Sequence, residues 1–193
     1  MIKSFKKVAI HFTGCAQVNE KGIWIRGQFG YLVEELANYV DHLDLLLDDI
    51  NEDKSVLNEY KTDFLIKNSN VSHISLGISG EKFSFLKRIF LIKTAFKNID
   101  YDFILIREPS RRSPFIRFFV DKIPIVFLMG GDWNTQINSS FFSMIKYRAY
   151  LYTKSLNMAM KSSLVFVNNE DLYSRWSKYT SNIFLTRTTS LCN

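Results

Sequence analysis

Three short apolar runs in this chain each end directly in polar or glycine residues. The runs are 104–106, 126–129 and 164–167, and the polar clusters that follow them are 107–110, 130–133 and 168–170. Buried strands of a parallel sheet are almost continuously apolar because helices cover both faces. Open α/β sheets bind ligands just beyond the carboxyl ends of their strands. The sequence therefore predicts a parallel sheet with a binding site where the polar clusters lie.

Strand and helix patterns alternate along the whole chain. Strands are predicted at 8–13, 44–48, 64–66, 71–78, 103–107, 124–129, 164–168 and 183–185, and helices at 29–40, 82–98, 113–121, 138–162 and 170–179. Residues 14–27 are predicted to form a polar, glycine-containing loop. Alternating strands and helices imply right-handed βαβ units. We therefore expect an α/β, Rossmann-like three-layer α/β/α sandwich with a mostly parallel sheet, in one domain over residues 1–193.

Composition and cysteine content favour a cytoplasmic protein. With 193 residues, 47% of them hydrophobic, the chain can bury one substantial core. Its two cysteines, Cys15 and Cys192, fit neither a metal site nor a disulfide framework, which favours a reducing compartment. The segment from Met1 to Cys15 is similar to a secretory leader, but its apolar stretch is short and contains His11, so a first strand is favoured. No run approaches the ~20 apolar residues of a membrane span.

Charge is divided unevenly between the two halves of the chain. Residues 1–81 hold 8 Lys and Arg against 12 Asp and Glu, whereas residues 82–193 hold 17 against 7. A basic half favours an anionic partner such as a phosphate, an anionic lipid surface or nucleic acid. The sequence has no helix-turn-helix, RNA-recognition or zinc-finger pattern, so we expect no specific nucleic-acid binding.

A glycine-containing segment leads into the first predicted helix. Gly14, Gly27 and Gly30, with Arg26 between them, could bring backbone amides and the helix N-terminus close to an anion. The spacing is not GxGxxG, so no dinucleotide fingerprint is present. An anion-binding loop and an ordinary surface loop both remain open as interpretations.

The first polar cluster contains arginines and a carboxylate. Arg107 and Arg111 offer planar guanidinium groups for phosphate or carboxylate, and Glu108 could orient one of them or act as a base. The alternative is a solvated run of charges. Because Arg107 directly continues an apolar strand, we favour the binding interpretation.

The second and third clusters complete the predicted site. Gly130 and Gly131 allow close approach of a ligand, Asp132 presents a carboxylate that could bind sugar hydroxyls or accept a proton, and Trp133 offers a flat ring. The alternative for Asp132 is a capping role. Two asparagines that end the third run, Asn168 and Asn169, are added to the binding set. The three histidines do not cluster, so no metal is expected.

Two predicted helical segments combine basic and apolar side chains. They cover residues 81–97 and 141–161. A core-packed helix with a solvated basic side is the simpler interpretation. Contact with an anionic membrane is the alternative, because basic amphipathic helices rich in Phe and Leu lie in that interface.

Taken in order, these segments resemble a known family. The chain is similar to the N-terminal domain of family 4 glycosyltransferases in four segments. They are the glycine loop that enters a helix with Leu-Val-Glu-Glu-Leu-Ala at 32–37, the strand end Arg-Glu-Pro-Ser, the strand end Gly-Gly-Asp-Trp, and the segment Leu-Val-Phe-Val-Asn-Asn-Glu. These are retaining enzymes of GT-B fold that often build lipopolysaccharide, capsule or other cell-surface glycans. Many relatives carry His where Arg107 stands, which puts the family's usual contact to the transferred sugar in doubt, whereas Glu108 and Pro109 match.

The resemblance implies that two domains bind the two substrates. In the family, the N-terminal domain binds mainly the acceptor and the C-terminal domain binds the nucleotide-sugar donor through a Glu-x7-Glu motif, which this sequence lacks. We therefore expect the acceptor side of a glycosyltransferase, with the donor-binding domain or subunit outside this chain, no tightly bound cofactor, and little activity in isolation. The acceptor is expected to be a glycan or lipid-linked sugar, handled in the cytoplasm or at the inner face of the cell membrane. A stand-alone Rossmann-like module that binds a small anionic ligand or a partner subunit is the alternative.

Overall fold

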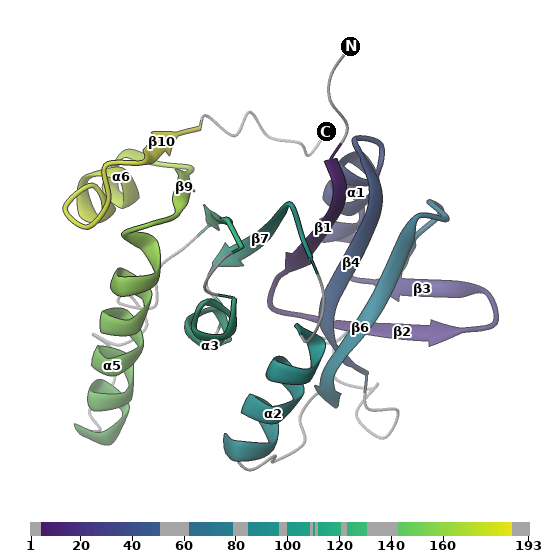
Figure 1. Ribbon diagram of the computed structural model, residues 1–193, viewed down its shortest axis with the longest axis horizontal. Coiled ribbons are helices and arrows are strands. Elements are labelled where there is room, and N and C mark those ends of the chain that lie inside the picture. The colour runs from purple at the N-terminus through teal and green to yellow at the C-terminus, as the bar shows by residue number, and fades with distance from the viewer. Residues whose placement is uncertain are drawn as a thin grey trace. The chain divides into compact units, whose positions relative to one another are not determined.

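The chain forms two compact units, Met1–Ile104 and Leu105–Asn193. The computed structural model describes residues 5–50, 62–78, 85–96, 100–108, 110, 112–120, 123–130 and 143–186. Figure 1 shows the alternation of strands and helices along the chain. Strand β7 (Phe103–Glu108) spans the boundary between the units.

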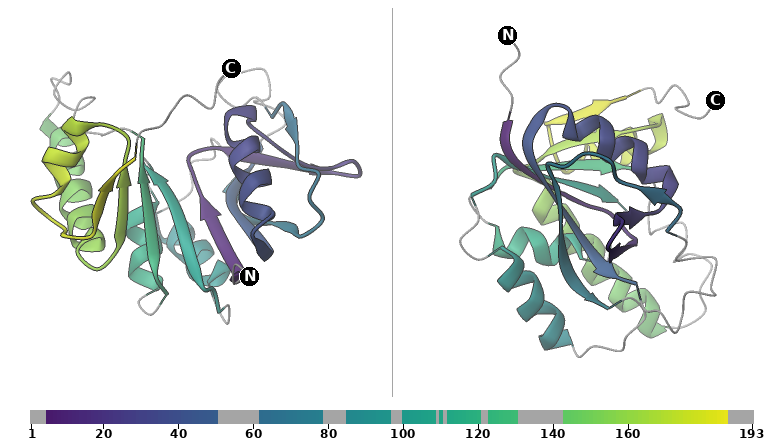
Figure 2. Two further views of the ribbon diagram at one scale, coloured as in Figure 1. Left: turned by 90° about the horizontal axis from the view of Figure 1, so that it is seen from above. Right: turned by 90° about the vertical axis from the view of Figure 1, so that its right-hand side faces the viewer.

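Three parallel strands form the centre of the first unit. They are β1 (Phe5–His11), β4 (Val40–Asp49) and β6 (Val71–Ile78). β4 lies between the other two, with Val8 opposite Leu43 on one side and Leu45 opposite His73 on the other. The helices α1 (Gly27–Ala37) and α2 (Phe85–Ala95) lie on opposite faces of these strands (Figures 1 and 2). This unit therefore has the helix, sheet, helix layering predicted from the sequence.

Burial along β4 and α1 explains why these segments pack as they do. Residues 43–47 of β4 are all buried, as expected for a strand covered on both faces. Helix α1 buries Phe29, Val33 and Ala37, which recur every four residues and so form one stripe. These apolar side chains supply most of the stability of the unit through removal of their surface from water.

One buried charge interrupts the apolar centre of β4. The carboxylate of Asp44 accepts a hydrogen bond from the Tyr101 hydroxyl at 2.8 Å and lies 3.2 Å from Lys7 Nζ and 3.0 Å from His42 Nε2. Burial and this hydrogen bond raise the pKa of Tyr101. Because every polar group in this cluster has a partner, Asp44 is accommodated inside the sheet.

An antiparallel hairpin follows β1 in the first unit. Its strands are β2 (Cys15–Asn19) and β3 (Gly22–Ile25), and β3 also pairs antiparallel with β5 (Phe64–Leu65). Gly22 has φ of 128°, which a side chain would strain. The prediction of a polar, glycine-containing loop over 14–27 is therefore wrong: the glycines indicated a loop, whereas the alternating residues 16–19 and the apolar residues 23–25 belong to short strands.

The second unit continues the sheet pattern with strands in the order β10, β9, β8, β7. The strands β8 (Ile125–Met129), β9 (Leu164–Val167) and β10 (Ile183–Leu185) are parallel to one another. Its helices are α3 (Ser113–Phe119), α5 (Ser143–Met160) and α6 (Glu170–Trp176). The predicted α/β, Rossmann-like fold with a mostly parallel sheet is confirmed.

Element ends differ from the predictions by a few residues. Helix α5 begins at Ser143 in the structure, and the predicted start at 138 lies outside the described residues. Strand β4 begins four residues earlier than predicted, because the polar side chains of Asp41 and His42 concealed its first part. Within the described ranges, no helix is both long enough and apolar enough to cross a membrane.

Candidate functional site

The carboxyl ends of three neighbouring strands lie together in the second unit. The backbone N–H of Gly130 donates a hydrogen bond to the carbonyl of Glu108 at 3.1 Å, which joins the end of β8 to the end of β7. On the other side, Met129 pairs with Val167, so Gly130 and Asn168 are the next residues on their parallel strands. The edge predicted from the three apolar runs is therefore present, and its polar residues follow adjacent strands.

Arg107 and Gly130 are in close contact at this edge. A Cβ atom built on Gly130 would lie 3.2 Å from Arg107 Nη2 and 3.5 Å from Cζ. The absent side chain at Gly130 therefore leaves the space that the guanidinium uses. A guanidinium held at the mouth of a parallel sheet is suited to bind a phosphate or a carboxylate with two hydrogen bonds.

Glu108 points into the interior. Its side chain is 1% exposed, and Oε2 accepts hydrogen bonds from the Ser110 N–H at 2.6 Å and the Tyr152 hydroxyl at 2.7 Å. Oε1 is buried and has no hydrogen-bond partner among the residues described. Burial raises the pKa of Glu108, while the hydrogen bonds from Ser113, Tyr152 and Ser110 lower it to a smaller extent. The protonated form is therefore favoured more than in an ordinary glutamate.

A hydroxyl network fixes the backbone that follows Glu108. The Ser113 hydroxyl donates to the Ser110 carbonyl at 2.9 Å, and the Tyr152 hydroxyl also contacts that carbonyl and lies 3.1 Å from Ser113 Oγ. The network ties the end of β7 to the start of α3 and to the middle of α5. Sequence analysis missed Ser113 and Tyr152. The Ser-Pro at the start of a helix was a local signal for the first, but nothing in the pattern of α5 distinguishes Tyr152.

The two asparagines after β9 differ in what they contact. Asn169 is the N-cap of α6: its Oδ1 accepts a hydrogen bond from the Leu172 N–H at 2.9 Å. Its Nδ2 donates to Oδ1 of Asn168 at 3.0 Å. Asn168 is exposed at the strand end. The local structure thus gives Asn169 a capping role, and ligand binding by either residue stays a prediction.

The glycine-containing segment lies in the first unit, around the start of α1. The Gly27 N–H donates to Asp63 Oδ1 at 2.7 Å, so a carboxylate of the chain itself already lies at this helix N-terminus. Arg26 precedes the helix and is exposed, and Gly14 lies between β1 and β2. Gly30 is buried inside α1 against the Phe64 ring. Ligand binding by these residues stays a prediction.

Four predicted site residues lie outside the described residues. They are Arg111, Gly131, Asp132 and Trp133. Their predicted roles in binding and catalysis therefore stay predictions. Over the ranges that the structure describes, no group of three or more His, Cys, Asp or Glu side chains could hold a metal ion.

Comparison with known proteins gives a likeness of fold. No protein-family model and no curated protein matches the chain. A crystal structure of UDP-N-acetylglucosamine 2-epimerase matches 95% of this chain and 48% of that chain, with 15% identity and a TM-score of 0.56. A UDP-N-acetylglucosamine 2-epimerase from Rickettsia bellii matches 91% of this chain and 44% of that one, with 13% identity and a TM-score of 0.47. The chain thus spans about half the length of these structures, and the first likeness shows the Rossmann-like fold.

Proposed function

We propose that this chain is the acceptor-side half of a GT-B sugar-nucleotide enzyme, and specifically of a family 4 glycosyltransferase. The observation that carries the proposal is the edge formed by the ends of β7, β8 and β9, with the Arg107 guanidinium packed against Gly130. Open α/β sheets bind their ligands at such edges. The likeness in fold to an enzyme whose name includes UDP-N-acetylglucosamine supports a sugar nucleotide as the substrate class.

In this proposal Arg107 binds an anionic group of the donor or acceptor. A charge-assisted hydrogen bond from a guanidinium contributes about 1.5–3 kcal/mol. Arg111, Gly131 and Trp133 would extend the binding surface. Gly14, Arg26, Gly27 and Gly30 of the first unit would bind part of a substrate on that unit. Asn168 would contact hydroxyl groups at the end of β9.

Two carboxyl groups are candidates for catalysis. Asp132 follows the second apolar run and would bind acceptor hydroxyls or accept a proton. Glu108 is buried and its pKa is raised, so its protonated form, which can donate a proton or a hydrogen bond, is favoured more than in an ordinary glutamate.

The substrates and partners follow from the same proposal. The donor is a nucleotide sugar bound mainly by a second, C-terminal domain or subunit, with no tightly bound cofactor in this chain. The acceptor is a glycan or lipid-linked sugar of cell-surface polysaccharide biosynthesis, reached at an anionic membrane surface on the cytoplasmic side. The net positive charge of residues 82–193 is suited to both phosphate and anionic lipid.

Binding of uridine diphosphate to the chain joined to a donor-binding half tests the role of Arg107. Calorimetric titration of this joined protein is compared with Arg107→Ala and with Lys178→Ala, which removes an equal charge beyond the far end of α6. We expect Arg107→Ala to weaken binding about tenfold or more. Lys178→Ala should leave it unchanged. Equal losses in both variants would indicate attraction by net charge alone.

Activity of the chain joined to a donor-binding half tests the reaction. Labelled UDP-N-acetylglucosamine is incubated with glycan acceptors, and the products are separated. Transfer of the label to an acceptor supports a glycosyltransferase, whereas conversion to the 2-epimer would indicate epimerase chemistry. Ligand binding with neither product would favour the alternative, a stand-alone module for a small anionic ligand or partner subunit.

A further inference from the structure

The hairpin of the first unit presents an aromatic residue among polar side chains on one face. Gln17 pairs with Trp24 across the hairpin, and Asn19 pairs with Gly22. Directly opposed residues and residues two apart on one strand point to the same face of a sheet. Gln17, Asn19 and Trp24 therefore lie on one face of the hairpin.

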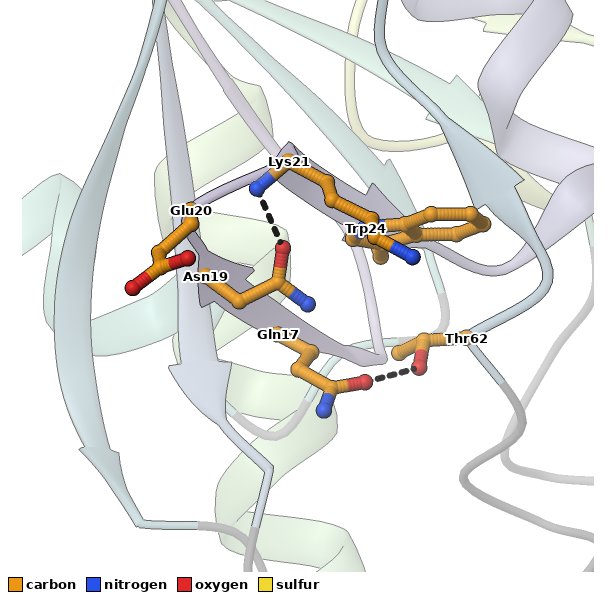
Figure 3. A pocket seen from close by; sticks show the side chains of 6 residues that line it. All are labelled: Gln17, Asn19, Glu20, Lys21, Trp24 and Thr62. Carbon is orange, nitrogen blue, oxygen red and sulfur yellow. Dashed lines mark hydrogen bonds between the residues drawn. The ribbon is translucent and has the colours of Figure 1, made fainter.

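This face borders a depression of about 650 Å³ in the first unit. Figure 3 shows the six side chains that line it: Gln17, Asn19, Glu20, Lys21, Trp24 and Thr62. Its volume falls within the range of small-molecule sites, about 300–1,000 Å³.

Existing hydrogen bonds hold the polar side chains of the depression in place. Gln17 Oε1 accepts a hydrogen bond from the Thr62 hydroxyl at 3.1 Å, and Asn19 Oδ1 accepts one from the Lys21 N–H at 2.9 Å. These bonds use the amide oxygens, so the NH2 groups are not engaged in them and remain able to donate. The indole N–H of Trp24 is buried and has no acceptor within the described part of the chain.

The charges around the depression argue against a phosphate ligand. Glu20 and Lys21 are the charged residues that line it, and their charges cancel. A phosphate site would need an excess of cations or several convergent N–H groups. A flat aromatic ring with amide donors and a carboxylate acceptor suits instead a neutral molecule with an apolar ring face and hydroxyl groups at its edge.

We infer that this face of the hairpin is a binding site for a neutral sugar ring, which stacks on Trp24 while its hydroxyl groups bond to Gln17, Asn19 and Glu20. The inference does not rest on the glycosyltransferase proposal, because it uses only residues of the first unit. If both are correct, the site would hold a part of the acceptor glycan.

The test uses the full chain with cellobiose, maltose and N,N′-diacetylchitobiose as probes. The Trp24 indole N–H signal is followed by NMR and is assigned from its loss in Trp24→Phe. We expect at least one disaccharide to shift this signal in a saturable manner. Because Trp24→Ala lacks the signal, its affinity is compared with that of the unmodified chain by calorimetric titration, and we expect it to be at least tenfold weaker. Gln17→Ala keeps the Trp24 ring and should weaken sugar binding by a smaller factor. It tests the site if Trp24→Ala does not fold.

Val18→Ala provides the matched control. Val18 is 57% exposed on the same hairpin strand but points to the opposite face, so its loss should leave sugar binding unchanged. The inference is overturned if none of the three disaccharides shifts the Trp24 signal, if uridine diphosphate alone does so, or if Val18→Ala weakens binding as much as Trp24→Ala. These outcomes are separate from the effect of Arg107→Ala on nucleotide binding.

Discussion

The guanidinium of Arg107 packs against Gly130 so closely that a methyl group at that glycine would lie 3.2 Å from Nη2. The two residues end adjacent strands, β7 and β8, and the Gly130 N–H donates to the carbonyl of Glu108 at 3.1 Å. Strand pairing thus places a cation beside a residue without a side chain. A substitution at Gly130 can therefore test whether ligand binding depends on the position of the Arg107 guanidinium.

Gly130→Ala should displace the Arg107 guanidinium with little effect on stability. The guanidinium is the far end of a flexible side chain and can move by a few tenths of an ångström, so we expect a change of less than about 1 kcal/mol in the free energy of unfolding. Affinity for uridine diphosphate should nevertheless fall, because binding depends on guanidinium geometry. Thermal unfolding and calorimetric titration measure the two effects.

Gly14→Ala provides a comparison for the effect of that substitution on stability alone. A Cβ at Gly14 would meet only the Phe12 ring, at 3.4 Å, which is an ordinary contact. Its stability should therefore change little. An unchanged nucleotide affinity in Gly130→Ala would show that the position of Arg107 against Gly130 does not matter for binding.

Gly30→Ala should destabilise the protein even though alanine favours helices. A Cβ at Gly30 would lie 2.3 Å from two atoms of the Phe64 ring, so the ring or the helix must move. Overpacking of this kind costs about 1–3 kcal/mol, whereas the helix propensity of alanine returns only about 1 kcal/mol. Chemical denaturation measures the difference.

A double-mutant cycle with Phe64→Leu identifies the cause. If the clash with the ring is responsible, Gly30→Ala should cost less in the Phe64→Leu background than in the unmodified chain. Equal costs in both backgrounds would mean that some other contact of Gly30 is responsible.

Periodicity in the sequence predicted the helices and the apolar strands because their signal is local. Helix α1 buries Phe29 and Val33 on one stripe, and β8 and β9 are short apolar runs. The apolar runs also predicted where the strands end, and the sequence therefore predicted that Arg107, Gly130 and Asn168 lie at one edge of the sheet. Strand order in a parallel sheet then brought them together.

The features that the sequence did not reveal depend on contacts between distant residues. Asp44 belongs inside a strand only because Tyr101, 57 residues away, donates to it. Tyr152 reaches Glu108 across 44 residues, and no local pattern marks such a pair. The hairpin around Trp24 is an exception, because residues 16–19 do alternate apolar and polar side chains, but its strands are short and the neighbouring glycines indicated a loop.

Glu108 should make the stability of the protein depend on pH. Burial raises the pKa of its carboxyl above the ordinary value of 4.5, so the folded state binds the proton more tightly than the unfolded state. The resulting stability is fully present below pH 4.5 and is lost as the pH rises through the folded-state pKa. Glu108→Gln keeps an acceptor for Tyr152 and cannot ionise. Relative to that variant, the unmodified chain should lose stability as the pH rises above 4.5 and through the folded-state pKa of Glu108.

Tyr152→Phe provides a check on this interpretation. Loss of its hydroxyl removes the hydrogen bonds to Glu108 and to the Ser110 carbonyl, which should cost about 1–3 kcal/mol. It should also raise the pKa of Glu108 further, because that hydroxyl lowers it. The pH-dependent loss should then extend to higher pH. A difference between the unmodified chain and Glu108→Gln that does not vary with pH would contradict the assignment.

Cys15 should be almost unreactive in the folded protein. It is buried at the start of β2, and burial, with a smaller contribution from the charge of Asp48, raises the pKa of its thiol to about 11. At pH 8 only about one thiol in a thousand is then a thiolate, the reactive form. In a Cys192→Ser background, alkylation by iodoacetamide should be slow in buffer and rapid in denaturant. Rapid alkylation of the folded chain at pH 8 would mean that β2 opens readily and that Cys15 does not stay buried.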